Sequence, residues 1–142
     1  MSQQVALLCR AHLHDERLHE VISAEPGQTV TLPCKAAESE LVTAVEWTRA
    51  AQETEDVLLY IRGEGEDPAN QNPSYKNRVS LKDEQMKDGD MSLVLKNVKP
   101  NDNGTYECRL QKQAFGLEPV CSVQLVVRPG EVLVGSEMFF SH

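Results

Sequence analysis

The residues with the most distinctive chemistry in this sequence are its four cysteines, Cys9, Cys34, Cys108 and Cys121. Cysteine side chains form disulfides, bind metals as thiolates or act as nucleophiles. Two cysteines separated by two residues would indicate a zinc or redox site, and no pair here has that spacing. Because four cysteines allow three complete pairings, their positions alone leave the pairing open.

A second set of potential ligands gathers near the N-terminus. It consists of Cys9, His12, His14, Asp15, Glu16 and His19. These residue types bind zinc, but here they lack a fixed spacing and supporting partners, so we expect no metal and no cofactor. No serine, histidine and acid can be assigned to a common pocket, and no glycine-rich phosphate loop follows a strand. The sequence therefore favours a binding module over an enzyme.

A possible modification site lies in a turn. Asn103-Gly104-Thr105 is an N-x-T sequon, which accepts a glycan in exported proteins. Asn72-Pro73-Ser74 is excluded by its central proline. Asn103 is thus the candidate glycosylation site.

Composition limits the class of partner. The chain has 142 residues, 40% hydrophobic and 25% charged, with a net charge of −8. An acidic protein is poorly suited to nucleic acid or to an anionic membrane, so we expect a protein partner and no small-molecule substrate. The length suits one domain. No run approaches the roughly 18 apolar residues of a spanning helix, so an extracellular protein would need segments that are not written here.

The elements that must position these residues are short strands separated by turn residues. The expected strands are Glu20 to Ala24, Gln28 to Lys35, Thr43 to Arg49, Val57 to Arg62, Arg78 to Leu81, Met91 to Lys96, Thr105 to Lys112 and Val120 to Val127. Strands at this spacing indicate an all-β sandwich or barrel. We expect a leader or flexible segment over residues 1–19, a domain over 20–128 and a tail over 129–142.

Alternation within the strands predicts that Cys34 and Trp47 face the core. Trp47 lies 13 residues after Cys34, and Cys108 lies 74 residues after it, preceded by the run Asp102-Asn103-Gly104-Thr105-Tyr106-Glu107-Cys108. This combination resembles the variable-type (V-set) domain of the immunoglobulin superfamily, a sandwich of two antiparallel sheets with Greek-key connections. The long stretch between Trp47 and Arg78 leaves room for the two extra strands of that type.

The resemblance implies specific structural roles. Cys34 and Cys108 would form the disulfide between the sheets, with Trp47 packed against it. Tyr106 would be the tyrosine corner, whose hydroxyl binds backbone upstream. Arg78 would pair with Asp102 as a partly buried ion pair.

Within that superfamily, the butyrophilin and myelin-oligodendrocyte-glycoprotein group, which includes T-cell costimulatory ligands, is the most similar over Glu20 to Val127. The motifs are Glu46-Trp47-Thr48-Arg49, the run from Asn72 to Leu81, and Ser92-Leu93-Val94-Leu95. The resemblance implies an extracellular, cell-surface module that binds a receptor on lymphocytes and modulates T-cell activation. The alternative is a homophilic adhesion module, in which a second copy is the partner.

In the resembled group, the binding face is built from the strands called G, F, C and C′. Alternation predicts that five side chains on C and F point outward: Glu46, Thr48, Glu107, Arg109 and Gln111. On C′ the run over residues 57–61 is apolar throughout, which suggests an outward side that a partner covers, and we assign Leu58, Tyr60 and Arg62 to that side. Tyrosine and arginine are enriched where interfaces bind most strongly. The alternative is a sheet face that is merely solvated.

Two interpretations compete for Cys121, which shares the inward parity of Val123 and Leu125. It could pair with Cys9 and clamp the N-terminus to the last strand. However, Cys9 precedes Val21 by 12 residues, enough extended chain for about 40 Å, so no partner is specified. We therefore predict that Cys121 is a buried, unpaired thiol and that Cys9 is free and exposed.

Overall fold

The computed structural model describes residues 18–36, 42–51, 53–68, 71–112, 117–129, 131–134 and 137–140. Five residues of the N-terminal set lie outside this range: Cys9, His12, His14, Asp15 and Glu16. The structure therefore does not test the predictions that Cys9 is a free, exposed thiol and that this set binds no metal. Within the described part of the chain the regular structure is strands and three short 3-10 turns, and no helix there is long and apolar enough to cross a membrane.

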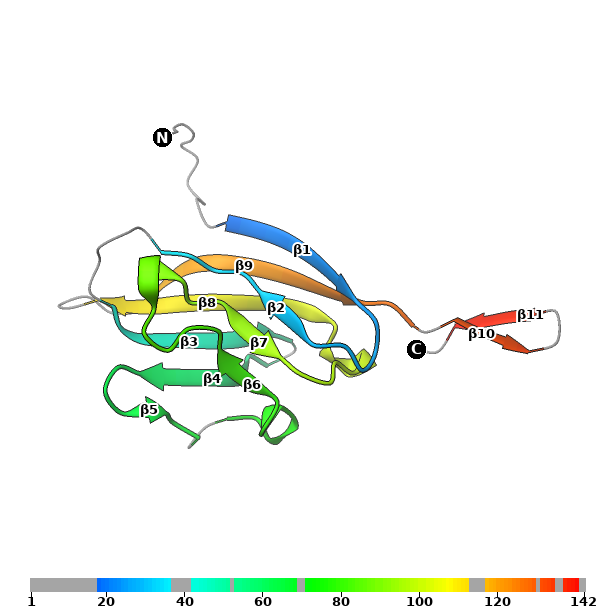
Figure 1. Ribbon diagram of the computed structural model, residues 1–142, viewed down its shortest axis with the longest axis horizontal. Coiled ribbons are helices and arrows are strands. Elements are labelled where there is room, and N and C mark those ends of the chain that lie inside the picture. Colours follow the sequence, from blue (N-terminus) through cyan, green and yellow to red (C-terminus); the bar gives the residue numbers. More distant parts are fainter. Residues whose placement is uncertain are drawn as a thin grey trace.

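Two sheets make up the domain (Figure 1). The larger has the order β1 (Leu18–Ala24), β9 (Leu117–Val127), β8 (Gly104–Lys112), β3 (Val42–Ala50), β4 (Glu55–Ile61) and β5 (Gly65–Glu66). Only the β1–β9 pairing is parallel among these. The smaller, antiparallel sheet has the order β2 (Val30–Leu32), β7 (Leu93–Leu95) and β6 (Val79–Leu81). The all-β sandwich expected from the sequence is therefore confirmed.

The remaining elements connect or extend the sheets. The 3-10 turns are η1 (Pro73–Tyr75), η2 (Lys87–Gly89) and η3 (Pro100–Asp102). An antiparallel hairpin of β10 (Glu131–Val134) and β11 (Glu137–Phe140) follows the last strand of the sandwich. Strand β1 begins two residues before the boundary expected at residue 20. The division into leader, domain and tail stays a prediction.

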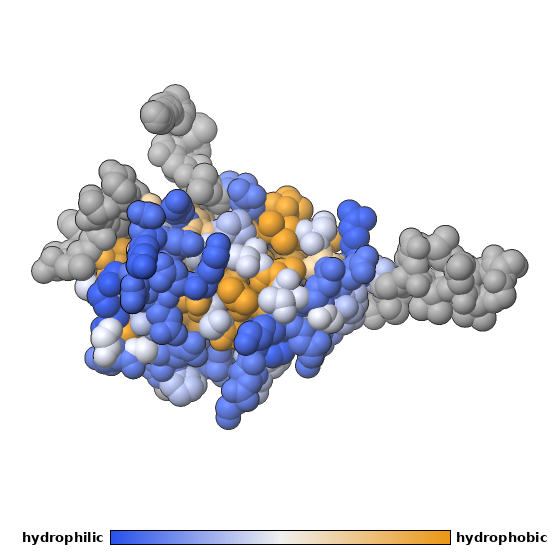
Figure 2. Space-filling view, viewed as in Figure 1, coloured by the Kyte–Doolittle hydropathy of each residue, from blue (hydrophilic) through white to orange (hydrophobic). Residues whose placement is uncertain are grey.

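Alternation of apolar and polar residues explains why the two sheets pack together. In β2, Val30 and Leu32 are buried while Thr31 between them is exposed. Trp47 of β3 is fully buried, and its indole Nε1 donates to the Met91 carbonyl at 3.0 Å. Burying one face of each sheet removes apolar surface from water, which drives the packing. Figure 2, seen from the side of β2, β7 and β6, shows hydrophobic residues gathered mainly mid-molecule among hydrophilic ones.

The disulfide between the sheets differs from the expected one. Cys34 is bonded to Cys121, with 5.7 Å between the Cα atoms, and Cys108 is a free, buried thiol. Cys121 is buried as expected, but the prediction that it is unpaired is wrong. The register explains the error, because Cys121 of β9 lies directly opposite Cys108 of β8. The V-set resemblance implied Cys108 as the partner of Cys34, but a sequence pattern cannot separate two cysteines that lie side by side in neighbouring strands.

The turn η3 holds one end of the sandwich. The Tyr106 hydroxyl donates to the Asp102 carbonyl at 2.6 Å, which is the contact of a tyrosine corner. Arg78 donates to both carboxylate oxygens of Asp102, at 2.9 and 3.0 Å, and both residues are buried. The Lys99 amide also donates to that carboxylate, at 2.7 Å. The ion pair expected from the sequence is therefore present, and it ties β6 to the turn before β8.

Candidate functional site

The candidate site is the side of β9, β8, β3 and β4 that faces away from the smaller sheet. The register places Glu46 of β3 between Arg109 of β8 and Leu59 of β4. We use the term outer face for the half-buried or exposed residues on this side of β3, β4 and β8: Glu46, Asp56, Leu59, Ile61, Glu107, Arg109 and Gln111. Of the residues predicted to point outward, Glu46, Glu107, Arg109 and Gln111 lie on this face.

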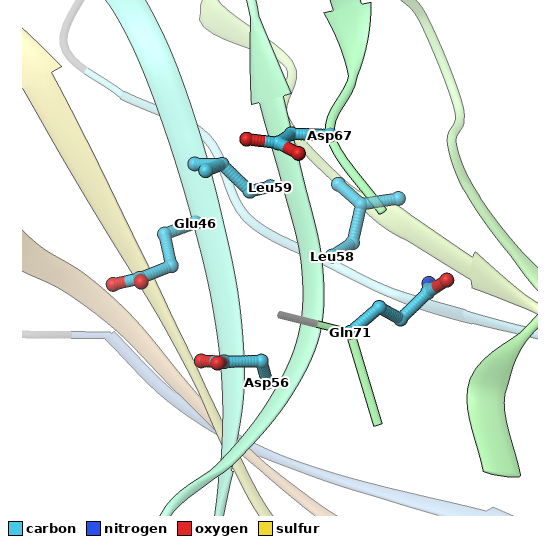
Figure 3. Close-up of a pocket in the computed structure, with 6 residues that line it drawn as sticks. All are labelled: Glu46, Asp56, Leu58, Leu59, Asp67 and Gln71. Atoms are coloured by element: carbon cyan, nitrogen blue, oxygen red, sulfur yellow. The ribbon is translucent and has the colours of Figure 1, made fainter. Parts of the chain in front are cut away.

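The prediction for β4 is wrong by one residue. Leu58 and Tyr60 are only 2% and 8% exposed and belong to the core, where Leu58 lies opposite Trp47. A register shift between Trp47 and Thr48 leaves Val57 as an extra residue in β4, and both Val57 and Leu58 are buried. Leu59 points outward instead. Figure 3 shows it on the opposite side of β4 from Leu58.

Two further predicted contacts also need correction. Thr48 is only 5% exposed, because β3 is an inner strand and Thr48 lies between Asp56 and Glu107 of its neighbours. Arg62 is exposed but follows the end of β4, and its Nε donates to the Val42 carbonyl at 2.7 Å. Thr48 therefore points to the side predicted but is covered, and Arg62 lies just beyond the strand.

Leu59 and Ile61 are the apolar residues of the outer face that sequence reasoning missed, and Asp56 is a third missed residue. The signal available was the apolar run over residues 57–61, which leaves no polar alternation to assign the faces. Only the pairing of Glu46 with Leu59 and of Ala44 with Ile61 assigns them to the outer face.

A small depression lies in this face, between β3, β4 and the segment after β5 (Figure 3). It is lined by Glu46, Asp56, Leu58, Leu59, Asp67 and Gln71. Its volume is about 40 Å³, whereas pockets for drug-sized ligands measure roughly 300–1,000 Å³. The depression suits a single side chain of a protein partner better than a small-molecule substrate.

Carboxylates dominate the charge in the depression. Burial raises the pKa of Glu46 above its ordinary value, and the negative charge of Asp56 adds to the effect. The positive charge of Arg109 opposes it. A positively charged or hydrogen-bond-donating group placed here would relieve the repulsion between Glu46 and Asp56.

Arg109 supplies positive charge at the centre of β8. Its guanidinium contacts the Glu107 carboxylate at 3.4 Å, with the two side chains 43% and 24% exposed. So exposed a pair stabilises the fold by under about 1 kcal/mol, which leaves the arginine available to a partner at little cost. The buried Nε of Arg109 has no hydrogen-bond acceptor among the described residues.

The structure also bears on the glycosylation and metal binding considered from the sequence. Asn103 is exposed at the end of η3, and its Oδ1 accepts a hydrogen bond from the Val127 amide at 2.7 Å. Its glycosylation stays a prediction. Across the described residues, no group of three or more His, Cys, Asp or Glu side chains is arranged to hold a metal ion.

Comparison with known proteins agrees with this geometry. Residues 18–126 match the family described as the immunoglobulin V-set domain. The CD276 antigen homolog of Xenopus laevis is 36% identical over 113 residues, covering 75% of this chain and 35% of that protein. The cell surface A33 antigen of Homo sapiens is 32% identical over 103 residues, covering 66% and 29%.

A chain from the crystal structure of ICOS in complex with ICOS-L and an anti ICOS-L VNAR domain has a TM-score of 0.70 and 26% identity. The match covers 83% of this chain and 58% of that chain. The present chain spans between 11% and 35% of the length of the curated relatives that it matches.

Proposed function

Because this chain belongs to the immunoglobulin V-set family, we propose that it is an extracellular binding domain of a cell-surface protein and that its outer face binds a protein receptor on lymphocytes. Modulation of T-cell activation would follow from that binding. The family predicted from the sequence is confirmed, whereas the receptor and the effect on T cells are the proposal.

The observation that carries the proposal is the composition of the outer face. Leu59 and Ile61 are half-buried apolar side chains on a sheet face, beside the charged groups of Glu46, Asp56 and Arg109. Apolar area surrounded by hydrogen-bonding and charged groups is typical of protein interfaces. Arginine is also among the residues that contribute most to such interfaces.

The relatives support a protein partner on another cell. One of them is named a cell surface antigen, and one structural neighbour comes from a complex of two proteins, ICOS and ICOS-L. The disulfide between the sheets is consistent with an oxidising, extracellular compartment.

The test uses a multimer of the full chain to stain activated T cells. Leu59→Ala and Arg109→Ala should each reduce staining at least about tenfold, as expected for central interface residues. Val94→Ala is the matched control, because Val94 is a half-buried apolar residue on β7 of the other sheet. Tyr60→Ala is unsuitable because Tyr60 is in the core. Staining that both outer-face variants retain in full would show that the partner binds elsewhere.

Self-association is the alternative use of the same face. Sedimentation over a concentration series distinguishes the two functions, because an adhesion module should form dimers at high micromolar concentration. Dimerisation that Arg109→Ala abolishes would favour homophilic adhesion over a lymphocyte receptor.

The sequon at Asn103 gives a second check on export. A chain secreted from mammalian cells should lose mass on treatment with an N-glycosidase, and Thr105→Val, which removes the sequon, should abolish that loss. Unchanged mass on treatment would show that Asn103 carries no glycan.

A further inference from the structure

Three cysteines converge in the core of the sandwich. Cys34 comes from the segment after β2, while Cys108 and Cys121 come from the neighbouring strands β8 and β9. Each of the three is at most 2% exposed, and all belong to one hydrophobic cluster. The free thiol and the disulfide therefore share a compartment from which water is excluded.

The strand register brings the free thiol next to the bridge. Cys108 and Cys121 are directly opposite one another in the antiparallel pair, so their side chains point to the same side of the sheet. The Cβ atoms of such pairs are about 4.5–5.5 Å apart. Cys34 reaches Cys121 from the other sheet with a Cα–Cα distance of 5.7 Å, which is ordinary for a disulfide. Cys108 thus presents a second sulfur to Cys34 from one strand away.

We propose that Cys34, Cys108 and Cys121 form a disulfide-exchange site, in which the domain accommodates either of two bridges between the sheets, Cys34–Cys121 or Cys34–Cys108. In the exchange, the thiolate of Cys108 attacks Sγ of Cys34 and forms a new S–S bond. The bond to Cys121 breaks, and Cys121 leaves as a thiolate that takes up the proton given up by Cys108. The step consumes no oxidant or reductant.

The packing of the core controls when exchange occurs. Burial raises the pKa of the Cys108 thiol, and the charge of Glu46 adds to this, so the closed domain holds Cys108 as a neutral thiol. Only the thiolate is a nucleophile. Exchange therefore requires the core around Cys108 to open to water, and the closed domain retains whichever bridge it had when it closed. The transfer moves the covalent link to Cys34 from β9 to β8.

The first experiment asks whether each bridge alone supports the fold. All variants carry Cys9→Ser, so that only the core cysteines remain, and are refolded with a glutathione redox buffer as the source of oxidant. Cys121→Ala should form a Cys34–Cys108 bridge, and Cys108→Ala should form Cys34–Cys121, as read by non-reducing peptide mapping. In each case the two thiols give up two electrons and two protons to glutathione disulfide.

The double variant Cys108→Ala/Cys121→Ala is the matched control without a bridge. Each single variant should melt at least about 10 °C above it, and reductant should remove most of that difference. If Cys121→Ala does not fold, or folds with Cys34 and Cys108 reduced, while Cys108→Ala folds with its bridge, the proposal is wrong.

The second experiment measures exchange itself in the Cys9→Ser chain. The protein is opened briefly at moderate denaturant and alkaline pH, quenched in acid, alkylated after full unfolding and mapped. The alkyl group marks whichever cysteine is the free thiol. Before the domain is opened it should lie mainly on Cys108, and after opening an increasing fraction should lie on Cys121. A label that stays on Cys108 alone after opening would show that no exchange occurs.

Discussion

The guanidinium of Arg78 and the carboxylate of Asp102 make two hydrogen bonds, of 2.9 and 3.0 Å, where neither residue is as much as a tenth exposed. Arg78 directly precedes β6 and Asp102 ends η3, so the pair joins two residues that are 24 positions apart in sequence. Burying both charges costs solvation, so the pair depends on both partners being present.

Removing one partner should therefore destabilise the domain strongly. We expect Asp102→Ala to lower the free energy of unfolding by about 3–5 kcal/mol, because Arg78 is left buried without its counter-charge. The measurement is urea unfolding followed by fluorescence of Trp47, the only tryptophan. Glu107→Ala, at the more exposed pair with Arg109, is the control and should cost under about 1 kcal/mol. Equal effects of the two variants would contradict the assignment.

The tyrosine corner allows a comparison of two buried hydroxyls. Tyr106→Phe removes the donor to the Asp102 carbonyl and leaves that carbonyl unsatisfied, which should cost about 1–3 kcal/mol of unfolding free energy. Tyr75→Phe removes only the 3.1 Å contact between the two tyrosine hydroxyls and should cost about 1 kcal/mol. The same urea titration measures both. A larger loss from Tyr75→Phe would show that the corner contact is the weaker one.

The ionisation of Glu46 should make the stability of the domain depend on pH. Because the folded domain raises the pKa of Glu46, the folded state binds this proton more tightly than the unfolded state, and stability from this group is lost as pH rises above about 4.5. Glu46→Gln should therefore be more stable than the parent at pH 7, by less than about 1 kcal/mol because solvent screens a half-exposed group. The difference should disappear at pH 4. A variant less stable than the parent at pH 7 would indicate that Arg109 outweighs burial and Asp56.

Substituting alanine at two glycines distinguishes the cost of a steric clash from the cost of a positive φ angle. Gly63 and Gly89 have φ of +88° and +75°, so alanine at either position should cost about 1–2 kcal/mol. A Cβ on Gly63 would meet nothing within 4 Å, whereas one on Gly89 would lie 2.7 Å from the Ala36 carbonyl oxygen. We expect thermal unfolding to show that Gly89→Ala costs at least about 1 kcal/mol more than Gly63→Ala. Similar melting temperatures would mean that the loop moves away from the new methyl group without cost.

In strands where apolar and polar residues clearly alternate, the sequence by itself determined which residues enter the core. Alternation is enough to place Cys34, just after β2, and Trp47 of β3 inside, because successive side chains of a strand point to opposite faces. The resemblance to the V-set family likewise implied the Arg78–Asp102 ion pair and the tyrosine corner at Tyr106, and the structure contains both contacts.

Only the tertiary structure decided how neighbouring strands align. The extra residue Val57 reverses the faces of β4, so that Leu59 and not Leu58 reaches the outer face, and nothing in a uniformly apolar run marks that shift. The register of β8 and β9 likewise places Cys121 beside Cys108, where it and not Cys108 bonds to Cys34. Both outcomes depend on contacts between residues far apart in sequence, which the pattern within one strand does not encode.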